Sequence, residues 1–150
     1  MLGGESVLYV ATALASNDRE LEHRVWLHRE RRPASWGTLE LGGGELGSVL
    51  EDADRWGAVL LDSLTLWASA RMLAGEDEEA SLEELDRFLD GATTLATPVI
   101  LVSDEVGLGI VPRGGAARTF RDLLGIANQR AAAAAEEVHL CVAGIGIRVK

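Results

Sequence analysis

The sequence predicts a single α/β domain with a mostly parallel sheet, and three observations carry this prediction. Short apolar runs rich in β-forming residues, of the kind buried on both faces, alternate with segments of helical periodicity. The runs end in polar or acidic residues, and the last part of the chain has the pattern of a hairpin. A length of 150 residues suits one domain with a sizeable core, so we expect residues 1–150 to fold as one unit.

Three apolar runs are the predicted strands: Val7 to Thr12, Ala58 to Asp62, and Pro98 to Val102. Right-handed crossovers between parallel strands would bring their carboxyl ends to one edge of the sheet. Ligands bind at that edge in folds of this class. We therefore expect Thr12, Asp62 and the acidic segment that follows the third run to lie near a ligand.

A helix is predicted after the first strand, with Ser16 or Asn17 as its N-cap. Leu21, Val25 and His28 share one face of it, so His28 should point inward or into a cleft. The other expected elements lie further along the chain. They are a loop over 41–47, helices over 46–54, 64–73 and 116–136, a helix opened by a Ser81–Glu84 capping box, and a hairpin of 138–142 with 145–149.

The composition limits the function classes. A formal net charge of −10 argues against general nucleic-acid binding, which requires a basic surface. Neither a signal peptide nor an apolar run long enough to span a membrane is apparent, so we expect a cytoplasmic protein. The one cysteine, Cys141, excludes an intrachain disulfide and a cysteine zinc site, and it is expected to be buried in a strand.

The most informative segment is the end of the first predicted helix, where His28 precedes Arg29, Arg31 and Arg32, and Pro33 ends the helix. Guanidinium groups bind phosphate oxygens in a bidentate manner. The pattern therefore suggests chemistry on a phosphate with His28 as the reacting group. The alternative is that these arginines form a solvated helix end favoured by the helix dipole, and that His28 is an ordinary packed residue.

Several motifs occur in one order along the chain: His28 with RERRP, TLE at 38–40, LLDSLTLW at 60–67, SDEVGLGIVP at 103–112, FRDLLGIANQ at 120–129 and the tail VAGIGIRVK. In this order they resemble the bifunctional adenosylcobinamide kinase/adenosylcobinamide-phosphate guanylyltransferase family of cobalamin biosynthesis. The resemblance covers nearly the whole chain, and the EVGxGIVP string is its most specific part. It implies a P-loop nucleotide-binding fold of the RecA-like type.

The resemblance also implies a function. The family phosphorylates adenosylcobinamide and then transfers GMP from GTP to the phosphate through a guanylyl-histidine, with release of pyrophosphate. His28 matches the guanylylated histidine. The family's nucleotide contacts match Ala11, Thr12, Ala13, Arg29, Glu30, Arg31, Arg32, Glu40 and Asp62. Implied ligands are GTP, ATP, Mg²⁺ and adenosylcobinamide phosphate, and the implied assembly is a homotrimer.

Physical chemistry is consistent with these roles. Neighbouring arginines disfavour a second cation and so keep a histidine nitrogen unprotonated and nucleophilic. They also stabilise charge that develops on phosphoryl oxygens. Glu40 is expected to accept hydrogen bonds from the N1 and N2 donors of guanine. Asp62 is a candidate to hold Mg²⁺ through water, and the N-cap of the next helix is its alternative or additional role.

One family element is not found in these 150 residues. No GxxxxGKS or GxxxxGKT motif occurs, and Lys150 is the only lysine. We therefore expect the kinase half to be lost or encoded upstream, as with a misassigned start. Since the strand before a P-loop is usually central, the sheet would have to close the gap, or another chain would have to supply the strand. Two rival hypotheses remain: a non-catalytic nucleotide-binding or partner-binding subunit, and a chain that is not stable alone.

Overall fold

The computed structural model describes residues 6–14, 30 and 32–150. The predicted helix that follows the first strand lies almost entirely outside this part of the chain. His28, Arg29 and Arg31 lie outside it as well, so their predicted roles stay predictions.

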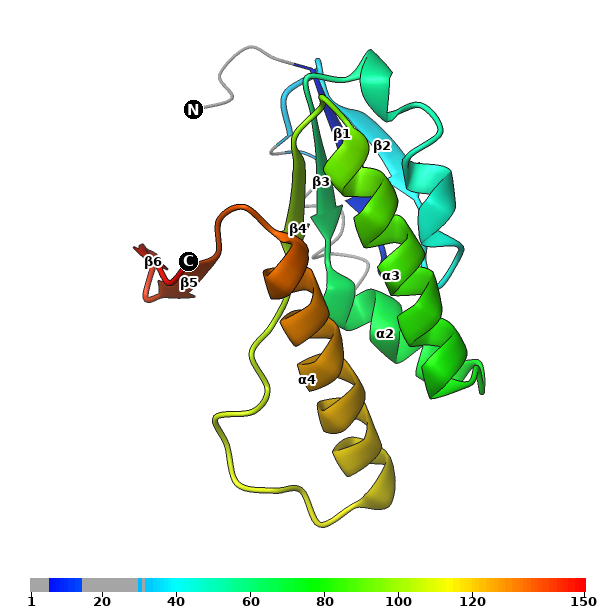
Figure 1. Cartoon of the computed structure of the whole chain (residues 1–150), viewed down its shortest axis with the longest axis vertical. Coiled ribbons are helices and arrows are strands. Elements are labelled where there is room, and N and C mark those ends of the chain that lie inside the picture. Colours follow the sequence, from blue (N-terminus) through cyan, green and yellow to red (C-terminus); the bar gives the residue numbers. More distant parts are fainter. Residues whose placement is uncertain (1–5, 15–29, 31) are drawn as a thin grey trace.

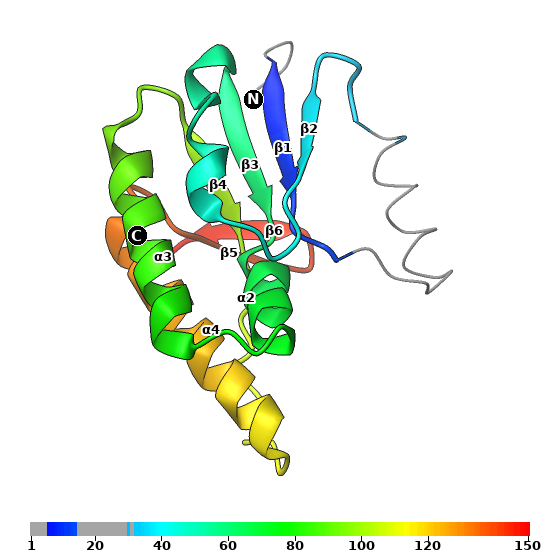
Figure 2. The same cartoon turned by 90° about the vertical axis from the view of Figure 1, so that its right-hand side faces the viewer.

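The described chain forms a four-stranded sheet in which every neighbouring pair is parallel (Figures 1 and 2). The strands are β1 (Val7–Ala11), β2 (Gly37–Glu40), β3 (Ala58–Asp62) and β4 (Val99–Val102), in the order β2-β1-β3-β4. This confirms the predicted parallel α/β class. Because all four strands run the same way, their carboxyl ends lie at one edge of the sheet.

The sheet is continuous across its four strands. β3 pairs directly with β4, from Val59 opposite Val99 to Asp62 opposite Val102. The backbone groups between β3 and β4 are therefore satisfied by each other.

The segment between β1 and β3 differs from the prediction. β2 was not predicted as a strand, and the short helix expected over 46–54 is two 3₁₀ turns, η1 (Leu46–Val49) and η2 (Ala53–Arg55). Gly37 begins β2 under the Trp56 ring, and a Cβ at this position would lie 2.1 Å from Cη2 of the indole. Only glycine therefore lets the tryptophan cover the start of the strand.

Helix α2 (Leu64–Leu73) occupies the range predicted for it, and α4 (Gly115–Ala134) lies close to its predicted range. The Ser63 side chain accepts the Leu66 N–H at 3.2 Å, so Ser63 is the N-cap of α2 and the alternative role for Asp62 is wrong. The predicted capping box is also wrong. Helix α3 (Glu78–Thr94) begins earlier, with Asp77 accepting the Ala80 N–H.

One face of the sheet carries the hydrophobic core. Leu8, Val10, Val59 and Leu61 point from β1 and β3 towards the helices and are at most 8% exposed. Figure 2 shows α3 and α4 against this side, with α2 beyond the carboxyl ends of the strands. Residues from every layer complete the core: Leu46, Val49, Ala53, Leu64, Trp67, Ala68, Leu82, Leu85, Phe88, Leu89, Leu123, Leu124 and Ala127.

The chain ends in an antiparallel hairpin of β5 (His139–Val142) and β6 (Ile145–Arg148), as predicted, but it forms a sheet of its own (Figure 1). Every residue of both strands is exposed, and so is Cys141, contrary to the expectation that it is buried. No helix within the described ranges is long and apolar enough to cross a membrane.

Candidate functional site

The carboxyl edge of the sheet brings two predicted nucleotide-binding acids onto adjacent strands. Ala11 at the end of β1 pairs with Glu40 on one side and with Asp62 on the other. Side chains paired in this way share a face of the sheet. Since neighbouring strands lie about 4.8 Å apart, the Cα atoms of Glu40 and Asp62 are separated by about 10 Å, with Ala11 on the strand between them. The two acids therefore flank Ala11 at the carboxyl edge of the sheet.

Tyr9 lies one row further into the sheet and reaches this edge with its hydroxyl. It pairs with Leu60, and its phenol donates a 2.5 Å hydrogen bond to Oδ2 of Asp62, two residues further along β3. Burial raises the pKa of Tyr9 to about 12, and the hydrogen bond to Asp62 and that carboxylate's negative charge act in the same direction. The phenol therefore remains a donor at neutral pH.

Arg32 lies over the aromatic ring of Tyr9. Its guanidinium carbon is 3.4 Å from the centroid of the Tyr9 ring, and Nη1 donates to Oγ1 of Thr38 at 3.1 Å. Nε of Arg32 is buried without a hydrogen-bond partner. Among the described residues no carboxylate forms an ion pair with Arg32. Within the described ranges this guanidinium is held in place without an ion-pair partner, which suits a group that binds an anion.

Thr12 fixes the junction between β1 and the end of β3. It is fully buried, and its hydroxyl both accepts the Ser63 N–H and donates to the Ser63 carbonyl, each at 2.7 Å. Both hydrogen-bonding functions of the side chain are thus directed at the residue after Asp62. The Thr12 hydroxyl orients the backbone here rather than facing solvent.

The other predicted contacts are placed less closely. Ala13 is partly exposed beyond the end of β1, and Glu30 is exposed. Of the predicted site residues, four lie together at one end of the sheet, around Tyr9 and Thr38: Ala11, Arg32, Glu40 and Asp62.

The described residues could supply only some of the ligands of a Mg²⁺ ion, with substrate phosphates and waters as the others. Within the described ranges no three His, Cys, Asp or Glu side chains gather to hold a metal ion. Asp62 has its Oδ2 bound by Tyr9, and no described residue is hydrogen-bonded to its Oδ1. Mg²⁺ is commonly bound by one or two carboxylates together with substrate phosphates and waters. Asp62 fits that kind of site and the described chain does not build a protein-only cage.

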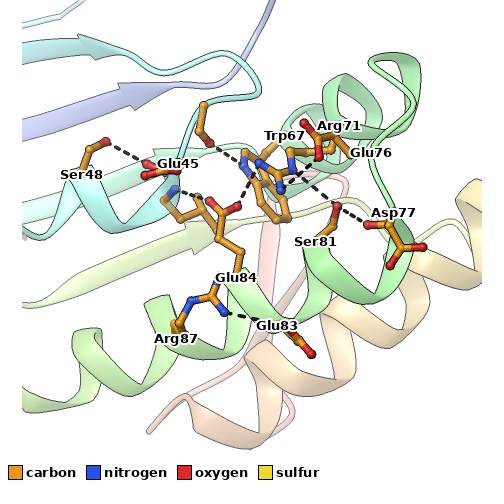
Figure 3. A network of polar contacts seen from close by, with 12 residues as sticks. Glu45, Ser48, Trp67, Arg71, Glu76, Asp77, Ser81, Glu83, Glu84 and Arg87 are labelled. Carbon is orange, nitrogen blue, oxygen red and sulfur yellow. Dashed lines mark hydrogen bonds and ion pairs between the residues drawn. The ribbon is translucent and has the colours of Figure 1, made fainter.

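A second arginine cluster lies on the core side of the sheet (Figure 3). Arg71 of α2 pairs with Glu84 of α3 at 2.9 Å, and both side chains are 11% exposed. The other carboxylate oxygen of Glu84 accepts the Leu46 N–H at 2.7 Å. Arg71 also lies 5.4 Å from the Trp67 ring, whose Nε1–H donates to the Gly44 carbonyl at 3.0 Å. These contacts tie the loop after β2 to both helices.

A cavity of about 250 Å³ opens beside this second cluster, lined by Glu45, Gly47, Glu84, Arg87 and Phe88. Its lining comes from α3 and the start of η1 and includes neither Arg32 nor Asp62. Its one buried acid, Glu84, already has partners for both oxygens.

Sequence reasoning did not single out Tyr9. The available signal was the alternation within the first strand, because Leu8 and Val10 face the core while Tyr9 and Ala11 share the face of Asp62. A tyrosine two residues before the end of a strand, on the face of a predicted site acid, carries a polar group towards that acid.

Comparison with known proteins agrees with the resemblance described above. The family model described as cobinamide kinase/cobinamide phosphate guanyltransferase matches residues 2–149. The bifunctional adenosylcobalamin biosynthesis protein CobU of Salmonella typhimurium is 36% identical over 156 residues, covering 96% of this chain and 86% of that protein. CobP of Pseudomonas aeruginosa is 37% identical over 147 residues, covering 98% and 84%, and CobU of Escherichia coli is 35% identical over 163 residues, covering 100% and 90%. The chain therefore belongs to the cobinamide kinase/cobinamide phosphate guanyltransferase family.

Proposed function

We propose that this chain transfers GMP from GTP to adenosylcobinamide phosphate through a guanylyl-histidine formed on His28. The observation that carries the proposal is the carboxyl edge of the sheet, where Arg32 stacks on Tyr9 without an ion-pair partner among the described residues, and where Glu40 and Asp62 flank Ala11. Family membership supplies the reaction class.

The reaction proceeds in two displacements at the α-phosphorus. An unprotonated nitrogen of His28 attacks, a P–N bond forms, the bond from phosphorus to the bridging α–β oxygen breaks, and pyrophosphate leaves. A phosphate oxygen of adenosylcobinamide phosphate then attacks the same phosphorus, and the P–N bond breaks to regenerate His28. A covalent intermediate divides one difficult displacement into two easier ones.

The described residues have distinct roles in this scheme. Arg32 stabilises negative charge on the phosphoryl oxygens, and Glu40 accepts hydrogen bonds from guanine. Asp62 would hold Mg²⁺ through water, and the bound ion would supply positive charge to the phosphate groups. Arg29 and Arg31, beside His28 in the sequence, add to the phosphate contacts.

The kinase half of the family activity is a separate question. The matches do not support the expectation that it is lost, because the family model spans residues 2–149 and its description includes both activities. The chain has no GxxxxGKS or GxxxxGKT motif. Transfer of the γ-phosphate from labelled ATP or GTP to adenosylcobinamide measures this half directly.

Incubation with α-labelled GTP and Mg²⁺ tests the guanylyl transfer. We expect an acid-labile, base-stable adduct on the wild-type chain that is discharged by adenosylcobinamide phosphate. His28→Ala should abolish the adduct, and His23→Ala, in the same predicted helix, is the matched control that should retain it. GTP binding without an adduct, unaffected by His28→Ala, would instead indicate a non-catalytic nucleotide-binding subunit.

A further inference from the structure

We propose that Tyr9 is a positioning residue for the nucleotide site: it holds Asp62 and Arg32 apart and fixes the orientation of both. This inference rests on the proposed function and adds to it a residue that does not itself contact the reacting atoms. The phenol hydroxyl binds Oδ2 of Asp62, and the ring face carries the Arg32 guanidinium.

The two groups that Tyr9 contacts have opposite charges and lie at one end of the sheet. Both groups contact the same side chain, and an arginine and a carboxylate that meet directly form an ion pair in which neither charge is left for a ligand. No ion pair joins Arg32 to Asp62 in the described structure. Tyr9 offers each group a different neutral contact, so both charges remain available.

The geometry leaves specific atoms free for a ligand. Tyr9 occupies one oxygen of Asp62, and nothing else in the described chain is hydrogen-bonded to the carboxylate. Thr38, which pairs with Tyr9 across the sheet, fixes the guanidinium through Nη1 alone. Since Tyr9 is 7% exposed and belongs to a strand paired on both sides, these contacts start from a rigid support.

The positioning role predicts a change in nucleotide binding that packing alone would not cause. Tyr9→Phe retains the ring under Arg32 and deletes only the hydroxyl that holds Asp62. We expect the dissociation constant for the Mg²⁺ complex of an α,β-methylene GTP analogue to rise about tenfold, since the bond lost is to a charged group. Tyr9→Leu, which also removes the spacer, should weaken binding further.

Trp67→Phe is the matched control, because it also removes one hydrogen-bond donor from an aromatic side chain beside an arginine. It should lower thermal stability at least as much as Tyr9→Phe while changing the dissociation constant less than twofold. Equal dissociation constants for Tyr9→Phe and the wild type, or equal changes in Tyr9→Phe and Trp67→Phe, would overturn the inference.

The analogue cannot be cleaved at the α–β position, so its binding is measured independently of the guanylyl adduct. A wild-type chain that binds it but forms no adduct from GTP would contradict the proposed transfer and still decide the role of Tyr9. A wild-type chain that does not bind the analogue would overturn both proposals.

Discussion

The clusters around Arg71 and Arg32 each combine an arginine, an acid and an aromatic side chain. They differ in whether the arginine and the acid form an ion pair. At Arg71 the guanidinium meets Glu84 directly at 2.9 Å, and the neighbouring Trp67 directs its N–H to a backbone carbonyl. At Arg32 the aromatic side chain lies between the two charges and binds each of them separately. The first arrangement satisfies its polar groups within the chain, whereas the second leaves binding capacity unused. We take the first as a structural clamp and the second as a ligand site.

The largest effect on stability is expected at the Arg71–Glu84 cluster. Glu84→Ala leaves Arg71 buried without its main partner and the Leu46 N–H without an acceptor, so we expect a loss of about 3–5 kcal/mol in the free energy of unfolding. Urea denaturation measures it. Glu83→Ala is the control, because Glu83 is exposed and its contact with Arg87 is 4.0 Å long, and it should change stability by less than about 0.5 kcal/mol. Similar losses in the two variants would remove the distinction between the clusters.

Arg32→Met should weaken nucleotide binding and leave stability almost unchanged. The stacking on Tyr9 contributes about 0.5–1 kcal/mol, and the buried Nε without a partner offsets it by about 1–3 kcal/mol, so stability should hardly fall. Binding of the GTP analogue, measured by calorimetry, should weaken at least tenfold because the guanidinium charge is lost. Arg87→Met, at an exposed site, should alter neither quantity. A large drop in stability with unchanged binding would make Arg32 a structural residue.

A smaller effect is the pH dependence of stability that arises from Tyr9 in the Arg32 cluster. The pKa of Tyr9 is raised to about 12 in the folded chain, above the value of about 10 for an unfolded tyrosine. A raised pKa stabilises the fold below pH 10, and this contribution is lost as the pH rises towards 12. At pH 11 the stability difference between wild type and Tyr9→Phe should be smaller than at pH 8 by about 1.4 kcal/mol. A constant difference across this range would contradict the buried hydrogen bond.

The parts of the fold that the sequence predicts are those fixed by local pattern. The apolar runs of β1, β3 and β4 form strands as predicted, although Ile100 and Val102 of β4 are exposed, and α2 occupies its predicted range. β2 has only four residues and begins with a glycine, and its place depends on Trp56, nineteen positions further along than Gly37. No local pattern reports such a contact.

Long-range contacts also explain the errors. Glu84 has the right spacing from Ser81 for a capping box, but its carboxylate is taken by Leu46 and Arg71 from other elements. Cys141 was expected to be buried because its strand is apolar, yet the hairpin pairs only with itself. For the site, family motifs predicted Arg32, Glu40 and Asp62, while Tyr9 is recognised only once the strand register shows that it shares a face of the sheet with Glu40 and Asp62.

The Thr12 hydroxyl, which holds the amide and the carbonyl of Ser63, also locks the alignment of β1 with β3. A slip of one residue between these strands would turn Tyr9 towards the helices and put Val10 or Thr12 opposite Asp62 in place of Ala11. Both hydrogen bonds of Thr12 would break at once in such a slip. The buried Thr12 hydroxyl therefore favours the observed register, and with it the position of Tyr9 beside Asp62.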